Sequence, residues 1–306
     1  MTLDQRINSE IYELITKGKI SSAKILCSVI KSDSDSPNLS FQGLPSYYFG
    51  KRDAETVMVN LNPGESVDKN IKGWTGDLKE PRSLNRKLLS ENPSTEEISE
   101  FICKYHDFQQ KFAEQEGYKT DSFDVKQAAF LTPWENNKIE GLPKNPNWSD
   151  TKIQGKAARS VVSNKLQLEL LPYASAKFDI NRKGDIKLLF PYIETLLDEI
   201  FTKKRTYVIF ASSKFEYIFK QYNKITGTET FTHGDLFKSN SSLKKIHDGT
   251  EGKLHVRCRS ITIHYQGKEQ PALIAHTFPS QGLGRAYDLM QTYGRLCYEQ
   301  WCQNVK

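Results

Sequence analysis

The sequence lacks the groupings of cysteine and histidine that bind metals in proteins. Its five cysteines form no CxxC pair, and its six histidines form no HxxxH pair. Structural zinc and iron–sulfur sites need clustered thiolate or imidazole ligands. We therefore expect no bound metal and no cofactor.

Long apolar runs and an export signal are also missing. No stretch approaches the roughly 20 apolar residues that cross a bilayer. The first residues, MTLDQRINSEIYELI, lack the basic-then-apolar order of a signal peptide. Charged residues make up 26% of the chain, which is typical of a soluble globular protein. We expect a cytoplasmic monomer that does not bind membranes.

Several common enzyme motifs are absent. There is no GxxxxGK[ST] loop and no GxGxxG after a first strand, which argues against nucleoside-triphosphate and dinucleotide enzymes. Adjacent serines in VIFASSKF have no GxSxG elbow around them, so nucleophilic serine chemistry is disfavoured, although an unrelated α/β hydrolase remains one interpretation. The net charge of +6 is compatible with a polyanionic partner without requiring one.

Apolar patterning predicts strands that alternate with helices. Helices are expected in 4–31, 92–115, 185–204, 213–222 and after the Gly-rich turn near 284, and strands in 56–61, 125–134, 165–175, 206–212, 254–265 and 271–275. This alternation predicts an α/β fold of three layers around a central, mostly parallel sheet. We expect residues 1–40 to form a helical N-terminal extension and residues 41–306 to form the α/β domain.

Three turns at predicted strand ends have unusual chemistry. They are NLNPGES at 60–66, ELLPYAS at 169–175 and AHTFPSQGLGR at 275–285. Open α/β sheets bind ligands at the carboxyl ends of their strands. We therefore expect these turns to share one edge of the sheet and to carry the function.

The first and last of these turns resemble those of the uracil-DNA glycosylase superfamily, particularly its mismatch-specific and single-strand-selective branches. There the first strand ends in a G-[IM]-N-P-G turn, and the last ends in H-P-S or N-P-S before a helix. This chain has LNPGES and HTFPSQGL. The resemblance does not cover the N-terminal helices or the polar loop around Trp74.

The resemblance implies a uracil-DNA glycosylase-like domain and a monofunctional DNA glycosylase that leaves an abasic site. Breaking the N-glycosidic bond passes through an oxocarbenium-like sugar. Asn62, by analogy with the matching asparagine of the family, would position the attacking water. Pro63 and Gly64 would expose backbone N–H groups and let the base approach. Asn60 and Glu65 flank them as expected substrate-binding residues.

The second motif departs from the family pattern. Family members have His directly before Pro-Ser, whereas here Thr277 and Phe278 follow His276. Either His276 stabilises the leaving base from a displaced position, or Phe278 occupies that position and no imidazole acts. The next residues are expected to bind DNA, with Leu283 as a wedge and the others near phosphates: Ser280, Gln281, Gly282 and Arg285.

The middle turn is where the family reads the flipped base, usually with an asparagine. Here the nearest polar residue is Glu169, whose carboxylate suits the exocyclic amine of a cytosine better than the carbonyl of uracil. If Glu169 points instead to solvent, Phe130 or Trp134 could stack on the base, as could Tyr173. Some superfamily members are thought to act on hypermodified cytosines of phage DNA as a defence, and the Trp74 loop could enclose such a base.

A different class of function remains open. The altered second motif and the modest charge also fit a catalytically inactive relative that binds nucleic acid. DNA, single- or double-stranded, is the expected partner in either case.

Overall fold

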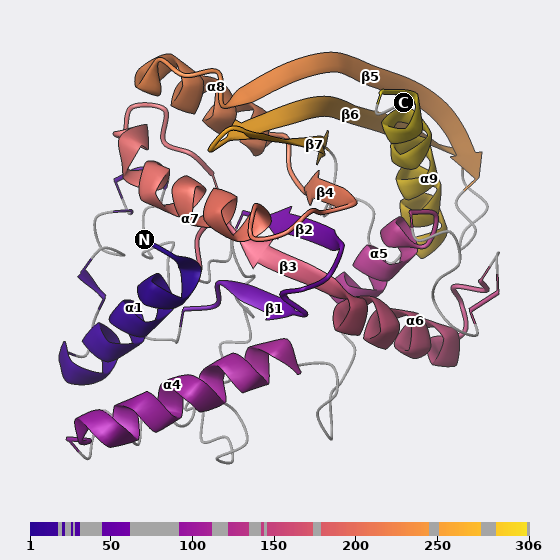
Figure 1. Cartoon of the computed structure of the whole chain (residues 1–306). Coiled ribbons are helices and arrows are strands. Elements are labelled where there is room, and N and C mark those ends of the chain that lie inside the picture. Colours follow the sequence, from indigo (N-terminus) through magenta and orange to yellow (C-terminus); the bar gives the residue numbers. More distant parts are fainter. Residues whose placement is uncertain are drawn as a thin grey trace. The chain divides into compact units, whose positions relative to one another are not determined.

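The computed structural model of the chain describes most of its secondary structure. The described residues are 1–17, 20–21, 26, 28–30, 45–61, 92–111, 122–134, 142–143, 146–173, 179–244, 251–276 and 286–304. Within them the elements are α1 (Leu3–Lys17), β1 (Tyr48–Gly50), β2 (Thr56–Asn60), α4 (Thr95–Gln110), α5 (Ser122–Leu131), α6 (Thr151–Asn164), β3 (Lys165–Glu169), η2 (Ile186–Leu189), α7 (Phe190–Ile200), β4 (Tyr207–Phe210), α8 (Lys214–Thr226), β5 (Phe231–Lys244), β6 (Glu251–Tyr265), β7 (Lys268–Ala275) and α9 (Tyr287–Asn304) (Figure 1). The predicted α/β class is confirmed.

The seven strands follow the order β1-β3-β2-β4-β7-β6-β5. β2 pairs with β4 in parallel, and β4 pairs with β7 in parallel. β7, β6 and β5 then form an antiparallel meander. The sheet is therefore mixed, with a parallel block that ends in an antiparallel hairpin.

The chain divides into two compact units. The first unit contains Met1–Phe49, Asn60–Gln110 and Leu168–Thr202, and the second contains Gly50–Val59, Lys111–Gln167 and Lys203–Lys306. The first 49 residues thus belong to a unit that also draws on two later segments.

In the first unit, α1 packs against α4 and α7. The stripe predicted for α1 is buried, including Ile7, Ile11 and Leu14. Reciprocal hydrogen bonds cap α4: the Ser94 N–H donates to the Glu97 carboxylate at 2.8 Å, and the Glu97 N–H donates to Ser94 Oγ at 3.2 Å. This capping box explains why α4 begins at Thr95, three residues after the start of the predicted helix.

In the second unit, the two faces of the sheet are covered by different helices. Met58, Ile209 and Leu273 belong to a buried cluster that also takes in side chains of α5, α6 and α9. On the alternating positions, Phe210 contacts Phe215 and Phe219 of α8. The period-2 alternation of strand side chains produces this division.

Four elements differ from the sequence prediction. The pattern of 125–134 predicts a strand, but the segment lies in α5 and the following turn, so this prediction is wrong. Its residues Ala128, Ala129, Phe130 and Leu131 are all fully buried. This continuous apolar run in the last half of a short helix shows no 3.6-residue pattern and resembles a buried strand in sequence. The other three, α6, β1 and β5, are not predicted as elements.

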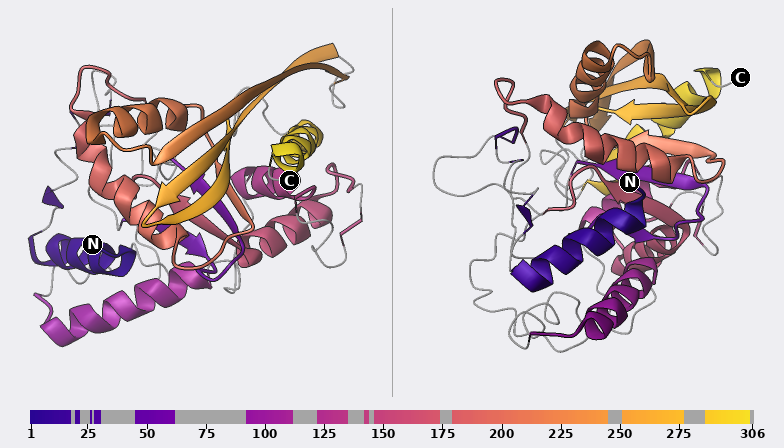
Figure 2. Two further views of the ribbon diagram at one scale, coloured as in Figure 1. Left: turned by 45° about the horizontal axis from the view of Figure 1, so that its top comes forward. Right: turned by 60° about the vertical axis from the view of Figure 1, so that its left-hand side comes forward.

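β5 and β6 form a long two-stranded ribbon in the second unit. Their pairing extends from Phe231↔Ile263 to Lys244↔Glu251, whereas β7 pairs only with Cys258–Tyr265 of β6. The ribbon therefore continues past the end of β7, as the orange and golden arrows show (Figure 2). β5 contains Gly, Asn and several Ser residues, so its strand state follows from pairing with β6 rather than from its own propensity.

Candidate functional site

Two of the three turns predicted to be functional follow strands of the parallel block, β2 and β7, whose carboxyl ends lie at one edge. β2, β4 and β7 are parallel, so their carboxyl ends share an edge. The Ala211 N–H donates to Val59 O at 2.8 Å, and the Ser213 N–H donates to His276 O at 3.3 Å, which holds the three strand ends in register. The chain continues from Val59 into Asn60, and from Ala275 into His276.

Most residues of the two motifs lie outside the described residues. These are Asn62, Pro63, Gly64 and Glu65 after β2, and Phe278, Ser280, Gln281, Gly282, Leu283 and Arg285 after β7, together with Trp74. The structure describes six of the predicted site residues: Asn60, His276, Glu169, Tyr173, Phe130 and Trp134.

Asn60 and Glu169 form a buried polar pair in the first unit. Asn60 Nδ2 donates to Glu169 Oε1 at 3.1 Å, and the two residues are 6% and 1% exposed. The N–H groups of Leu170 and Leu171 donate to the carbonyls of Asn60 and Leu61, so the chain after β3 runs beside the chain that enters the first motif. Glu169 therefore does not point to solvent, which removes that alternative.

The carboxamide oxygen of Asn60 is buried without a hydrogen-bond partner among the described residues. An unsatisfied buried acceptor costs about 1–3 kcal/mol. The adjoining segment 62–70 is not described, and a ligand N–H is another group that could satisfy this oxygen. Asn60 thus presents an acceptor next to a carboxylate at the end of β2.

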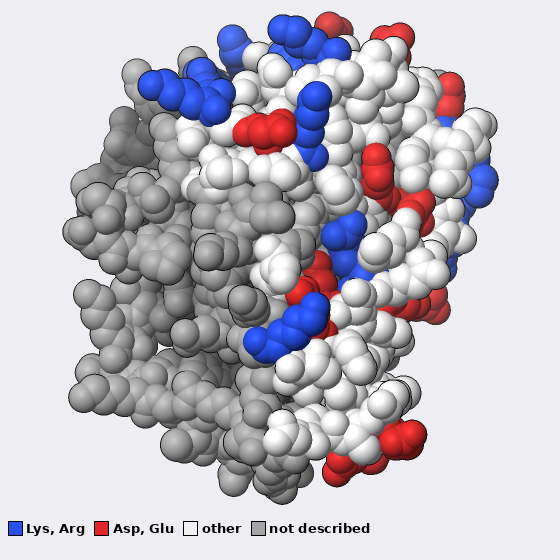
Figure 3. All heavy atoms as spheres, turned by 90° about the vertical axis from the view of Figure 1, so that its left-hand side faces the viewer, with Lys and Arg blue, Asp and Glu red and all other residues white. Residues whose placement is uncertain are grey.

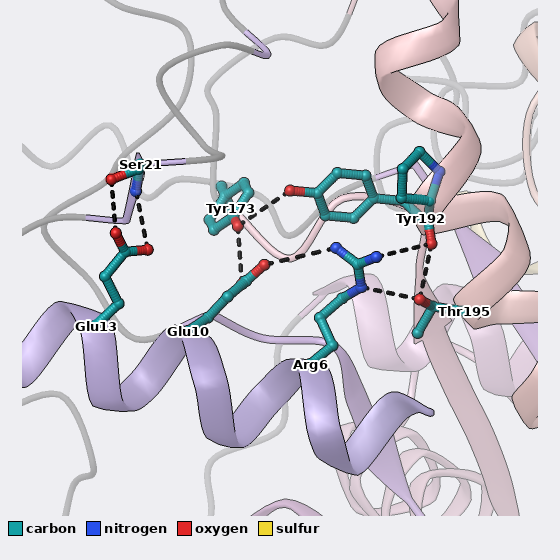
Figure 4. A network of polar contacts seen from close by, with 8 residues as sticks. Arg6, Glu10, Glu13, Ser21, Tyr173, Tyr192 and Thr195 are labelled. Atoms are coloured by element: carbon teal, nitrogen blue, oxygen red, sulfur yellow. Dashed lines mark hydrogen bonds and ion pairs between the residues drawn. The ribbon is translucent and has the colours of Figure 1, made fainter. Parts of the chain in front are cut away.

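Tyr173 belongs to a buried hydrogen-bonded network on α1 and α7. Its hydroxyl donates to Glu10 Oε2 at 2.8 Å and lies 3.3 Å from the Tyr192 hydroxyl (Figure 4). Arg6 joins from the same helix as Glu10, with Nη1 3.9 Å from Glu10 Oε1 and its guanidinium 4.6 Å from the centre of the Tyr192 ring. Tyr173 is 1% exposed, so in this structure its ring is packed rather than presented for stacking.

Arg6 ties α1 to α7 within this network. Its Nε donates to Thr195 Oγ1 at 2.9 Å, and its Nη2 donates to Pro191 O at 3.0 Å (Figure 4). Burial raises the pKa of Glu10 from 4.5 to about 7, and the hydroxyls of Tyr47 and Tyr173 and the charge of Arg6 only partly oppose this effect. Glu10 is therefore a carboxyl group that titrates near neutral pH, a property common among functional acids and bases.

Phe130 and Trp134 are core residues of the second unit. Both are fully buried, and their rings stack with centroids 6.0 Å apart. Trp134 also contacts the rings of Tyr207, Tyr298 and Trp301. Neither ring is exposed for a base to stack on it in this structure.

His276 lies in a cluster of charged side chains in the second unit. Its Nε2 is 3.1 Å from Glu216 Oε2, and Glu216 Oε1 is 3.2 Å from Arg259 and 2.7 Å from Lys220. Partial burial raises the pKa of Glu216, but the hydrogen bond from Lys220 and the charge of Arg259 outweigh it, so the pKa is lowered overall. Glu216 is therefore ionised at neutral pH and faces the imidazole.

The protonation of His276 limits what it can do. Burial lowers its pKa from 6.5, and the charges of Arg259, Arg257 and Lys220 lower it further, while Glu216 opposes them. Nε2 lies 3.1 Å from the Glu216 carboxylate but makes no hydrogen bond with the described residues. Because Nε2 faces this carboxylate, the neutral ring keeps its proton on Nε2, and Nδ1 then accepts hydrogen bonds. His276 can donate from Nδ1 to a departing base as the imidazolium, which Glu216 favours.

Sequence reasoning missed Glu10, Glu216 and Arg259. Glu10 carried a signal, because it shares the helical face of Ile7, Ile11 and Leu14, where a carboxylate is unusual. Glu216 and Arg259 carried none, since the pairing of distant elements alone brings them to His276.

The described residues contain no group of three His, Cys, Asp or Glu side chains arranged to hold a metal ion. Among the described helices, none combines the length and apolarity that a bilayer span requires. Comparison of the chain with protein-family models, with curated proteins and with solved structures gave no match.

Proposed function

We propose that the chain is a monofunctional DNA glycosylase of the uracil-DNA glycosylase superfamily, with the corresponding fold. One observation carries the proposal furthest. The two segments that resemble the superfamily follow β2 and β7, which lie on either side of β4 in one parallel block. β2 and β7 therefore end at the same edge of the sheet, where open α/β sheets bind their ligands.

The proposed reaction is hydrolysis of the N-glycosidic bond of a flipped base. Asn62 holds a water through its side-chain carbonyl, and the water oxygen bonds to the anomeric carbon of the sugar. The bond to the base breaks with its electron pair leaving on the base, and the proton of the water passes to solvent. Asparagine is a weak activator of water, so stabilisation of the leaving base is the larger contribution.

The proposed role of His276 gives a characteristic pH dependence. Donation from Nδ1 to the leaving base requires the imidazolium, and the lowered pKa makes this form scarce at neutral pH. Base release should therefore fall as the pH rises through the lowered pKa of His276. If Phe278 occupies this place instead, release should be independent of the state of the imidazole.

A cytosine derivative is the proposed substrate. Asn60 ends β2 with a buried carboxamide oxygen that accepts no hydrogen bond from the described residues, and its amide nitrogen is held by Glu169. Hydrogen-bond acceptors at the end of β2 fit the exocyclic amine on carbon 4 of a cytosine-type base, whereas uracil has a carbonyl on this carbon. Modified cytosines of phage DNA keep a nitrogen substituent on carbon 4.

The test is base release from oligonucleotides and whole DNAs. The panel contains uracil, mismatched bases, and hydroxymethylated or glucosylated cytosine, and alkali converts abasic sites into strand breaks. We expect release from the cytosine derivatives. Asn62→Ala should slow it roughly 100- to 1,000-fold without loss of DNA binding. Asn164→Ala is the matched control, because Asn164 is an exposed asparagine at the end of α6.

Unchanged release in Asn62→Ala would rule out this mechanism. Tight DNA binding without release from any substrate would instead favour the second candidate, an inactive relative that binds nucleic acid. The observation that favours this candidate is the contact of His276 Nε2 with Glu216 Oε2 at 3.1 Å, because it directs this nitrogen toward a carboxylate of the protein rather than toward a ligand.

A further inference from the structure

The strand register sets Lys238 and Arg257 opposite each other. β5 and β6 pair these two residues directly, and the pairing of β6 with β7 stops one residue earlier, at Cys258↔Ala275. Lys238 and Arg257 are thus the first cross-strand pair on the part of the ribbon that extends past β7. The His276 N–H donates to Arg257 O at 3.0 Å, so this pair adjoins the candidate site.

Both side chains point away from the helices of the large apolar cluster. Side chains alternate along a strand, and directly opposed residues share a face. Val256 and Cys258 are buried in the cluster that contains α9 residues, so Arg257 and its partner Lys238 face the other side. Both are exposed. Arg259, two residues along the same face, reaches Glu216 on α8 at 3.2 Å.

Two like charges directly opposite each other destabilise an antiparallel pair. Within the described part of the chain, neither Lys238 nor Arg257 forms an ion pair. The nearby carboxylate of Glu216 is already engaged by Lys220 and Arg259. Among the described residues nothing compensates the positive charge of this pair, and an anion bound from outside would remove the repulsion.

The ribbon carries about half of the chain's net charge of +6 by sequence. By sequence, β5 and β6 carry five Lys or Arg residues and two acidic residues. On the face of the molecule drawn in Figure 3, the described basic and acidic side chains are instead interspersed. The neighbouring cations Lys238 and Arg257 fit a ligand with repeated negative charges better than a single small anion.

We propose that Lys238 and Arg257 bind the phosphate backbone of the nucleic acid whose base enters the candidate site. The proposal rests on the proposed function for the identity of the polyanion. Exposed lysine and arginine side chains bind backbone phosphates by displacing counterions, and two-stranded ribbons serve as nucleic-acid-binding elements in other proteins. Because Lys238 and Arg257 lie close to His276, a nucleic-acid strand bound to them would lie beside the sheet edge at which β2 and β7 end.

The test measures affinity for an unmodified duplex and for one of its strands across a range of salt concentrations. We expect Lys238→Gln with Arg257→Gln to weaken binding about tenfold at low salt. The slope of log Kd against log salt should shrink by about one for each phosphate that the variant no longer neutralises. The matched control is Lys152→Gln with Arg295→Gln, which removes the same residue types from exposed positions on α6 and α9.

Equal reductions in the double variant and in the control would overturn the proposal, since net charge alone would then explain them. An unchanged affinity and salt slope would overturn it as well. The outcome is separable from base release. If the wild type releases no base but the double variant binds DNA more weakly, the phosphate-binding surface is supported and the glycosylase proposal is ruled out. If the wild type releases base and the double variant binds DNA as tightly as the wild type, the glycosylase proposal is supported and the surface is ruled out.

A charge reversal separates binding from folding. Lys238→Glu places an acid opposite Arg257, so the melting temperature should stay the same or rise, while DNA affinity falls further than in Lys238→Gln. A purely structural role predicts that stability and affinity decline together, and that result would contradict the proposal.

Discussion

Glu10 and Glu216 show how the surroundings of a single carboxyl decide its charge. Glu10 is buried among tyrosine hydroxyls with one arginine near it, so desolvation dominates and its pKa rises to about 7. Glu216 is partly exposed and contacts two cations, so its pKa falls. The two residues therefore respond to pH in opposite ways.

The raised pKa of Glu10 makes folding less favourable as the pH increases. At pH below 4.5 the carboxyl is protonated in both states. Between 4.5 and about 7 the unfolded chain loses this proton first, so the free energy of unfolding falls by about 3 kcal/mol across this window. Glu10→Gln should remove this decline and be more stable than the wild type at pH 8, as measured by urea unfolding at several pH values.

Glu13→Gln is the control on the same helix. Glu13 accepts hydrogen bonds from Ser21, which lower its pKa, so its contribution is lost as the pH falls rather than as it rises. Parallel pH profiles for the wild type and Glu10→Gln would show that Glu10 titrates normally and would contradict the expectation.

Glu216 should control the protonation of His276. The carboxylate favours the imidazolium, so Glu216→Gln should lower the pKa of His276 further, and the imidazole should titrate at lower pH in an NMR titration. The control is Lys220→Gln, since Lys220 lowers the same pKa and its removal should raise it. A pKa that is identical in the wild type and Glu216→Gln would mean that the pair does not form in solution.

At the scale of elements, α5 and α9 pack so closely that only glycine fits between them. A Cβ on Gly294 of α9 would lie 2.7 Å from the carbonyl carbon of Phe130 on α5. Alanine favours a helix over glycine by about 1 kcal/mol, but here the neighbour is backbone and cannot rotate away. The steric cost therefore outweighs the gain in helix propensity, and the substitution of Gly294 by alanine lowers the free energy of unfolding.

Gly294→Ala should destabilise the protein by about 1–3 kcal/mol or more, measured by urea or thermal unfolding. Gly227→Ala is the comparison. Nothing lies within 4 Å of its added Cβ, and only the φ of +71° opposes the substitution. The destabilisation at position 294 should exceed that at 227. An increase in stability at 294 would mean that the helices can separate without cost.

The sequence predicts those elements whose own residues show a clear periodicity, and it fails for elements that depend on their neighbours. α1, α4, α8 and β4 follow their periodicity and caps, so these elements are confirmed. The second half of α5, residues 127–131, is fully buried, and the sheet, α6 and α9 contribute to the cluster around it, so its helical pattern is lost. β5 has little strand propensity, and only pairing with β6 makes it a strand. Sequence periodicity and helix caps therefore predict the elements that are buried on one face and exposed on the other.

At the scale of the whole molecule, the sequence predicts where the site should lie better than which residues meet there. Strand alternation predicts that the carboxyl ends of β2 and β7 share an edge, and the parallel pairings of the strands confirm this part of the prediction. The partners of His276 come from α8 and β6, so only the completed sheet brings them together. Tyr173, Phe130 and Trp134 are aromatic in sequence, but packing decides that they are buried.

The division of the chain into two units has a consequence for its synthesis. The chain passes between the units five times, and the last segment of the first unit ends at Thr202. All residues of that unit, including the Glu10 network, are therefore synthesised while much of the second unit is still to be translated. The segments Gly50–Val59 and Lys111–Gln167 of the second unit are synthesised before β4 and β7, with which they share a unit. We expect a chaperone that binds unpaired strands to act mainly during this interval of synthesis.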